Sequence, residues 1–157
     1  MQLLEMIDLL NADLAREYSH WHFYVHAARM VETIHRAELK EFFDNEAADE
    51  LAHVQQWGDL IVGLGGVPTT SVAEFKNDLT DPVALLKETV KMESAVVAHF
   101  VQRQDECAEL EKNGDNDRVD GRRIDVFLDD QILDSRGTVD DVTKMLMGLD
   151  KASRGRS

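Results

Sequence analysis

The sequence has little that would tie a chain together or interrupt a helix: 157 residues contain 1 cysteine, 2 prolines and 9 glycines. The single cysteine, Cys107, excludes a disulfide within the chain and fits a reducing compartment, so we expect a cytoplasmic protein. So few prolines and glycines favour long helices over many turns. The N-terminus lacks a basic region followed by an apolar core, so we expect no signal peptide.

Positive charge is also scarce, because 17 lysines and arginines stand against 31 aspartates and glutamates, for a net charge of −14. Nucleic acid and anionic membranes attract basic surfaces, so we expect neither as a partner. No uncharged stretch is long enough to span a bilayer. What remains is an ordinary mix of 43% hydrophobic and 31% charged residues, typical of one soluble domain. We place that domain at residues 1–150 and a polar tail at residues 151–157.

Apolar residues recur with helical spacing in four stretches, which predicts an all-α chain. A short polar break separates the first two stretches, so the first two helices should form an antiparallel hairpin. The next connection, residues 65–80, is long for a helical bundle and predicts a crossover along its length. Asp81 followed by Pro82 marks the start of the third helix. The predicted helices cover about residues 1–33, 37–64, 81–112 and 118–149.

Each predicted helix carries polar residues where its buried face should be apolar. On the second helix, Glu50 and His53 are three residues apart and share the face of Phe43 and Trp57. A charge at such a position is costly unless it is paired or bound to a metal. The corresponding residues on the other helices are Glu17, with Tyr24 two turns further along, then Glu93, then Gln131 with Asp134.

Ligand-type side chains from all four helices would meet at one level of such a bundle, and most of them are carboxylates. Carboxylates packed together without a cation repel and raise one another's pKa values. Two metal ions remove that repulsion, with Glu50 as the natural bridging ligand. Oxygen-rich ligation with one or two imidazoles suits iron or manganese. The alternative is a polar layer without metal, since a Glu-x-x-His pair on a helix is common by chance.

Several other polar residues have a weaker claim to the site. Tyr24 either hydrogen-bonds a metal ligand, supplies an electron to oxygen chemistry, or packs with an exposed hydroxyl. Glu46 is a candidate for passing iron inward, whereas Asp49 is expected on a solvated helix face. Three histidines lie mostly off the apolar face, so we assign them surface or subunit-contact roles rather than ligation: His20, His22 and His26.

With these residues in place, the chain resembles the ferritin superfamily over nearly its full length, and bacterial non-haem ferritins and bacterioferritins in particular. The shared pattern is Glu17, Tyr24, Glu50-x-x-His53, Glu93 and Gln131-x-x-Asp134. The resemblance implies a four-helix bundle in which one iron is held by the first glutamate, Glu50 and His53. The second iron would be held by Glu50 and Glu93, with the glutamine and the acid of the fourth helix nearby.

The resemblance also implies an activity. A ferroxidase of this kind oxidises Fe(II) with O2 or peroxide and stores the ferric product. It works as a homo-oligomer, of which a closed cage is one form.

The chain departs from the family pattern at three points. Bacterioferritins carry a second Glu-x-x-His on the fourth helix, where this chain has Gln131 and the shorter Asp134, so we expect a weaker or more mobile second iron. They also bind haem through a methionine directly after the bridging glutamate; Leu51 stands there, so we expect no haem. We predict no clear fifth helix, and the size of any cage is left open.

Two alternatives to an iron-storage ferroxidase stay open. One is a non-storage di-metal peroxidase or catalase on the same bundle, either rubrerythrin-like or with manganese. The rubredoxin-like module of a rubrerythrin needs paired cysteines, and this chain has only Cys107. The other alternative is a metal-free helical assembly module, which the metal content of the protein would distinguish from both enzymes.

Overall fold

The computed structural model of the chain describes residues 1–154, with side chains described for residues 1–149. Within these residues there are helices and connections but no strand, so the predicted all-α class is confirmed. The elements are α1 (Leu3–Met30), α2 (Arg36–Gly63), α3 (Pro82–Leu110), the short 3-10 helix η1 (Glu111–Asn113) and α4 (Asp115–Arg154).

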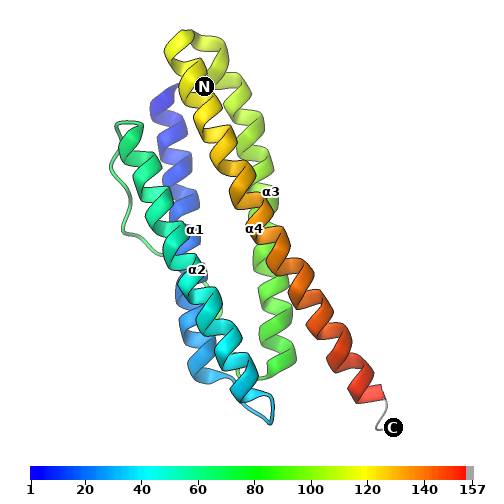
Figure 1. Cartoon of the computed structure of the whole chain (residues 1–157). Helices are drawn as coiled ribbons and strands as arrows, with labels where there is room; N and C mark the ends of the chain where they lie inside the picture. The colour runs from blue at the N-terminus through cyan, green and yellow to red at the C-terminus, as the bar shows by residue number, and fades with distance from the viewer. Residues whose placement is uncertain (155–157) are drawn as a thin grey trace.

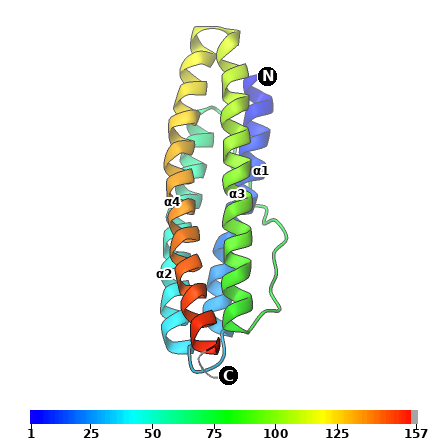
Figure 2. The same ribbon diagram turned by 90° about the vertical axis from the view of Figure 1, so that its right-hand side faces the viewer.

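The helices form a four-helix bundle in which α1 and α2 make one antiparallel hairpin and α3 and α4 make another (Figures 1 and 2). The N-terminus lies beside the α3–α4 turn, where the Asn113 side-chain amide donates to the Met1 carbonyl at 2.6 Å. The C-terminal end of α4 lies at the opposite end of the bundle (Figure 1). Of the expected tail, residues 151–154 continue α4 and residues 155–157 lie outside the described part. Residues 1–154 contain no fifth α-helix.

The predicted crossover between the second and third helices is confirmed. Residues 66–81 have no regular structure, and they pass along α1 back to the end of the bundle at which α2 begins (Figure 2). This path lets α3 start there and run parallel to α2. Three hydrogen bonds mark the path: Thr69 N–H to Asn11 Oδ1 at 2.8 Å, Ala73 N–H to the Ala15 carbonyl at 3.0 Å, and Glu32 N–H to the Thr80 carbonyl at 3.0 Å.

The ends of α2 and α3 follow the predicted local signals. The Asp81 carboxylate accepts a hydrogen bond from the Ala84 N–H at 3.0 Å, and Pro82 occupies the first helical position. This cap satisfies one of the free N–H groups of the first turn. After α2, Gly65 has a φ of +88°, a conformation that favours glycine, and there the chain turns away from the helix.

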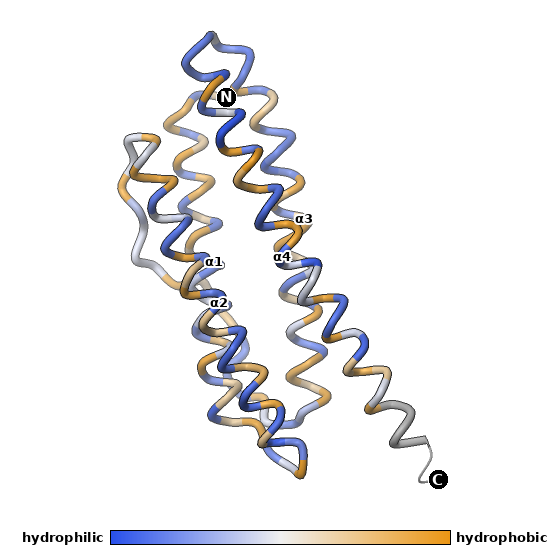
Figure 3. Tube along the Cα trace, viewed as in Figure 1, coloured by the Kyte–Doolittle hydropathy of each residue, from blue (hydrophilic) through white to orange (hydrophobic). Residues whose placement is uncertain are grey.

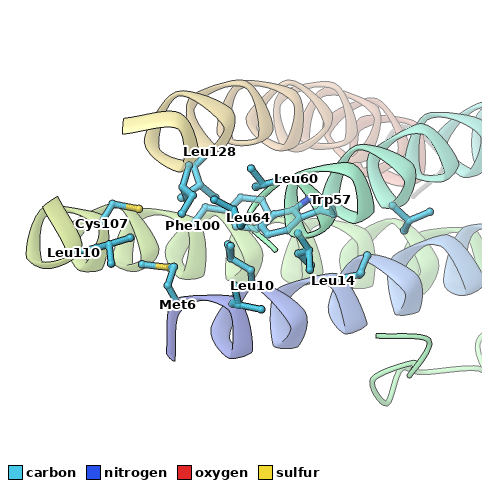
Figure 4. Packing of buried hydrophobic residues seen from close by; sticks show 14 of the residues in the cluster. Met6, Leu10, Leu14, Trp57, Leu60, Leu64, Phe100, Cys107, Leu110 and Leu128 are labelled. Atoms are coloured by element: carbon cyan, nitrogen blue, oxygen red, sulfur yellow. The ribbon is translucent and has the colours of Figure 1, made fainter. Parts of the chain in front are cut away.

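The apolar core is divided into two buried clusters along the bundle. Helices with apolar and polar residues in alternation supply both clusters (Figure 3). The cluster nearer the N-terminus includes, as labelled in Figure 4, Met6, Leu10, Leu14, Trp57, Leu60, Leu64, Phe100, Cys107, Leu110 and Leu128. The second cluster includes Phe23, Tyr24, Phe43, Leu86 and Val142.

Between the two clusters, each of the first three helices buries acidic residues instead of apolar ones. Glu17 lies between Leu14 and Phe23 on α1, and Glu50 and Glu93 hold the corresponding places on α2 and α3. The fold therefore places a polar layer in the middle of an otherwise apolar core. None of the described helices combines the length and the apolar character needed to cross a membrane.

A buried ion pair links α1 to α3 near the polar layer. Asp13 is 0% exposed and Arg103 is 4% exposed. Arg103 donates from Nε to Asp13 Oδ2 at 2.8 Å and from Nη2 to Oδ1 at 3.1 Å. Arg16 also donates to Asp13 Oδ1, at 2.7 Å, and Glu106 accepts from Arg103 Nη1. The Asp13 carboxylate is thus the common acceptor of two arginines.

Candidate metal centre

Five potential ligands meet in the polar layer, as two sets of three that share one residue. The first set is Glu17, Glu50 and His53, and the second is His20, Glu50 and Glu93. In each set, one ligand-type atom from every residue lies within 4.8 Å of the others. Helices α1 and α2 each supply an acid and a histidine three residues apart, which places both on one helical face. Because Glu50 belongs to both sets, its carboxylate lies between two potential cation positions.

The geometry of the first set is defined by the two ring nitrogens of His53. Nδ1 lies 3.4 Å from Glu50 Oε1 and 3.7 Å from Glu17 Oε2. Nε2 lies 3.1 Å from Asp134 Oδ2, a hydrogen bond when Nε2 carries the proton. In that tautomer the lone pair of Nδ1 faces the two carboxylates, which is an arrangement that a cation would satisfy.

The second set contains several buried polar atoms that lack a hydrogen-bond partner. His20 Nδ1, Glu50 Oε2 and Glu93 Oε2 all lack one. The other oxygen of Glu93, Oε1, accepts a hydrogen bond from the Tyr24 hydroxyl at 2.6 Å. Leaving buried acceptors unsatisfied costs free energy. A bound cation would give these three atoms a common partner.

Electrostatics in the layer favour cation binding as well. Burial, together with the neighbouring Glu50 and Glu93 carboxylates, raises the pKa of Glu17 well above its usual value. Burial and the Glu93 carboxylate likewise raise the pKa of Glu50. Burial lowers the pKa of His20, which keeps its imidazole neutral at pH 7. Carboxylate oxygens and neutral imidazoles are donors that suit iron or manganese, so the residues present fit a pair of such ions.

The structure therefore brings together the four ligands predicted from the first three helices, with Tyr24 against one of them. The two predicted ligands of α4 adjoin this group without joining either set of three. Gln131 is buried, but its Oε1 accepts from Trp57 Nε1 at 3.2 Å and its Nε2 donates to Gln56 Oε1 at 3.2 Å. The Asp134 side chain is 60% exposed, and it contacts the layer only from outside, through its hydrogen bond to Nε2 of His53.

His20 lies in the polar layer and not at the surface. A surface or subunit-contact role was predicted, but His20 is only 6% exposed and faces Glu93, with Nδ1 3.9 Å from Glu93 Oε1. The surface assignment is wrong because α1 buries a wider arc than its apolar residues suggest. A signal was present in the sequence: Glu17-x-x-His20 repeats the spacing of Glu50-x-x-His53.

The two other histidines of this stretch contact the crossover of their own chain. His22 is exposed and its ring stacks on Phe75, with 6.0 Å between ring centroids. His26 is half-buried and its Nε2 lies 2.8 Å from the Asn77 carbonyl. Both side chains thus lie along the path of the crossover outside the polar layer.

Comparisons with known proteins agree with this architecture. The ferritin-like domain family matches residues 7–120, which include every member of the two sets. This chain belongs to the ferritin-like domain family. The predicted resemblance to the ferritin superfamily is thereby confirmed, while no curated protein matches the chain.

Several solved structures are similar to this chain in fold. A ferritin-like diiron-carboxylate protein from Bacillus anthracis str. Ames is 30% identical, with a TM-score of 0.79 over 92% of this chain and 96% of that one. Rhodobacter capsulatus bacterioferritin is 21% identical, with a TM-score of 0.82 over 94% and 87%. The dodecameric thioferritin of Bacteroides fragilis, a bacterioferritin-related protein, is 25% identical, with a TM-score of 0.63 over 93% and 90%.

A cavity of about 350 Å³ connects the polar layer to the surface between α2, α3 and α4. Glu50, His53 and Glu93 contribute to its inner wall. Its lining also includes Glu46, Asp49, Gln56, Asp134, Ser135 and Thr138. Burial and the Glu93 carboxylate raise the pKa of Glu46 to about 7. Acidic side chains along such an opening concentrate cations near the centre.

The raised pKa values of Glu17 and Glu50 predict how the stability of the metal-free protein depends on pH. Below about pH 4.5 both carboxyl groups are protonated in the folded and in the unfolded chain, so they do not change the free energy of unfolding. Above this pH the unfolded chain releases these protons readily, whereas the folded chain retains them. The free energy of unfolding should therefore fall as pH rises from 5 to 8. We expect the Tm in EDTA to drop by at least about 3 °C, which corresponds to roughly 1 kcal/mol at this chain length.

The control for this pH prediction is Glu17→Gln, which removes one of the buried titrating groups. Its Tm should change less between the two pH values than that of the unmodified protein. A Tm of the metal-free protein that rises with pH over this range would contradict the prediction. Metal binding should offset the decline, because cations displace the protons.

The contact between Asp134 and His53 gives a prediction for ligand orientation. Asp134→Ala removes the acceptor that holds Nε2, so His53 should bind its metal less tightly, by about 10-fold, the lower end of the range for such partners. Anaerobic titration with Co(II), followed by its visible absorption, measures this affinity. Asp130→Ala, on the exposed face of α4, is the matched control. Loss of a whole metal equivalent would instead show that Asp134 is itself a ligand.

Proposed function

We propose that this chain is a ferroxidase that oxidises Fe(II) with O2 or peroxide at a di-metal site inside each bundle, and stores the iron in a homo-oligomer. The observation that carries the proposal is the pair of three-residue sets sharing Glu50 in the polar layer. The diiron-carboxylate character of the Bacillus anthracis neighbour, at 30% identity over nearly the whole chain, supports iron as the metal. Manganese is the alternative, since the same donor types bind both.

In this proposal the protein's side chains bind two Fe(II) ions as substrate and hold them near each other. Glu17 and His53 hold one ion, Glu93 holds the other, and Glu50 contacts both. Each Fe(II) loses one electron, and one O2 takes up both electrons and two protons to leave as hydrogen peroxide. Binding of the cations releases the protons that Glu17 and Glu50 retain in the empty site. Tyr24 donates to Oε1 of Glu93 and so positions this carboxylate, whose Oε2 has no other partner and is left to bind the cation.

The storage part of the proposal rests on assembly. The Bacteroides fragilis neighbour is described as dodecameric, which supports a homo-oligomer for this chain too. Whether the oligomer closes into a cage decides between iron storage and a di-metal peroxidase or catalase. We also retain the prediction of no haem, because Leu51 follows Glu50 where bacterioferritins use methionine.

Sedimentation of the purified protein after anaerobic Fe(II) loading and exposure to air tests the proposal. Ferric absorbance that sediments with a large assembly, at many irons per chain, is the expected result. About two metals per chain on a dimer or other small oligomer would indicate a di-metal enzyme without storage. A protein that binds no metal under these conditions would reject both and favour the metal-free assembly module.

A further inference from the structure

We propose that His20 of α1 binds the second metal ion, so that this ion needs no ligand from α4. The inference rests on the proposed di-metal function and concerns how the second position is built. Each ion would then have one imidazole, one glutamate of its own and a share of Glu50. The two imidazoles would come from the Glu-x-x-His pairs of α1 and α2.

Geometry is the first support. Glu17 and His20 are one helical turn apart on α1, as Glu50 and His53 are on α2, and the two helices pack as an antiparallel hairpin. His53 faces the Glu17 side of the layer, whereas His20 faces Glu93. The two imidazoles therefore serve opposite sides of the shared Glu50 carboxylate.

Burial without a partner is the second support. His20 is 6% exposed, and its Nδ1 lacks a hydrogen-bond partner. Nδ1 lies 3.9 Å from Glu93 Oε1, too far for a hydrogen bond, and Tyr24 already donates to that oxygen. A buried histidine that serves only packing would be expected to have this nitrogen bonded. Glu50 and Glu93, the other two residues of this set, each have an unpartnered oxygen as well, which makes a shared cation the simplest common partner.

The third support is that the two ligands predicted on α4, Gln131 and Asp134, make their hydrogen bonds outside the second set. Both ends of the Gln131 amide are used, by Trp57 and by Gln56. Asp134 lies at the surface and bonds the outer nitrogen of His53. Neither Gln131 nor Asp134 belongs to the second set. His20 completes that set of three with Glu50 and Glu93.

Anaerobic Co(II) titration of the 157-residue chain, measured by calorimetry, visible absorption and metal analysis, tests the inference. The unmodified protein should bind about two Co(II) per chain. His20→Ala should bind about one, with the remaining affinity changed by less than about 3-fold, because the first set is intact. His22→Ala, an exposed histidine of the same helix, should still bind two, and so should Gln131→Met.

The outcomes separate this inference from the proposed function. If the unmodified protein binds no Co(II), the di-metal function itself fails. If His20→Ala still binds two ions with unchanged affinity, the His20 assignment is overturned and the function survives. If instead Gln131→Met loses the second ion and His20→Ala still binds two, the ligand to the second ion comes from α4 and not from His20. Should His20→Ala not fold, His20→Leu, which restores most of the volume without a donor atom, is read in the same way.

Discussion

Glu50→Ala should abolish rapid Fe(II) oxidation while leaving the bundle folded. Glu50 is the only residue common to both three-residue sets among the described side chains, so its removal weakens both cation positions at once. Residues that merely orient a ligand typically change metal affinity or activity by about 10–100-fold, so loss of a shared ligand should exceed the upper end of that range. The fold should survive, because the variant removes a buried carboxylate that its neighbours repel.

The measurement is the initial rate at which ferric absorbance appears when anaerobic Fe(II) and protein are mixed with aerated buffer. Glu41→Ala is the control, because Glu41 is exposed on the same helix and touches neither set. Circular dichroism should give the same helix content for both variants. Oxidation by Glu50→Ala at the rate of the unmodified protein would remove the di-metal assignment.

Asp13→Ala should strongly destabilise the bundle. Asp13 is fully buried and accepts hydrogen bonds from both Arg103 and Arg16. Without it, Glu106 is the only acidic partner left to the buried Arg103 guanidinium among the described side chains. Removing one member of a buried ion pair typically costs about 3–5 kcal/mol, and with Glu106 remaining we expect about 3 kcal/mol. Urea unfolding at one fixed protein concentration measures the change.

Two further variants distinguish an uncompensated charge from lost packing. The double substitution Asp13→Leu with Arg103→Met replaces both partners with apolar groups, and should recover most of the stability lost in Asp13→Ala. Lys112→Ala breaks the exposed pair with Glu109 and should leave the urea midpoint unchanged. If Asp13→Ala unfolds at the same midpoint as the unmodified protein, the ion pair does not stabilise the bundle.

The helices were predictable because their signal is local. Apolar spacing and the Asp81–Pro82 start located all four α-helices and the crossover. Their ends were less certain, because polar terminal turns carry no apolar pattern. The fourth helix was predicted at residues 118–149 and extends over 115–154. The first was predicted to reach residue 33 and stops at Met30, before Thr33, which has a φ of +75°.

The candidate site was predictable only where neighbouring apolar residues show which face of a helix is buried, as they do around Glu17, Glu50 and Glu93. At one turn of α1, the sequence offers His20 and Trp21 for the same inward position. Hydropathy favours Trp21, yet Trp21 is only half-buried and His20 is buried. The same limit applies to α4, where the prediction that Gln131 points at the metals depends on how that helix is rotated against α2. Rotation depends on packing between helices far apart in sequence, which a local pattern does not record.

The division of the core into two apolar clusters has a consequence for cooperativity. Each cluster can be stabilised by its own packing, whereas the layer between them holds carboxylates that repel one another when no metal is bound. Without metal, the two ends of the bundle are joined mainly by the continuous helices. A metal bound at Glu50 would link α1, α2 and α3 at the level of the polar layer, where apolar packing contributes least to stability. Loading the protein with iron would then also make two loosely linked halves unfold as one unit.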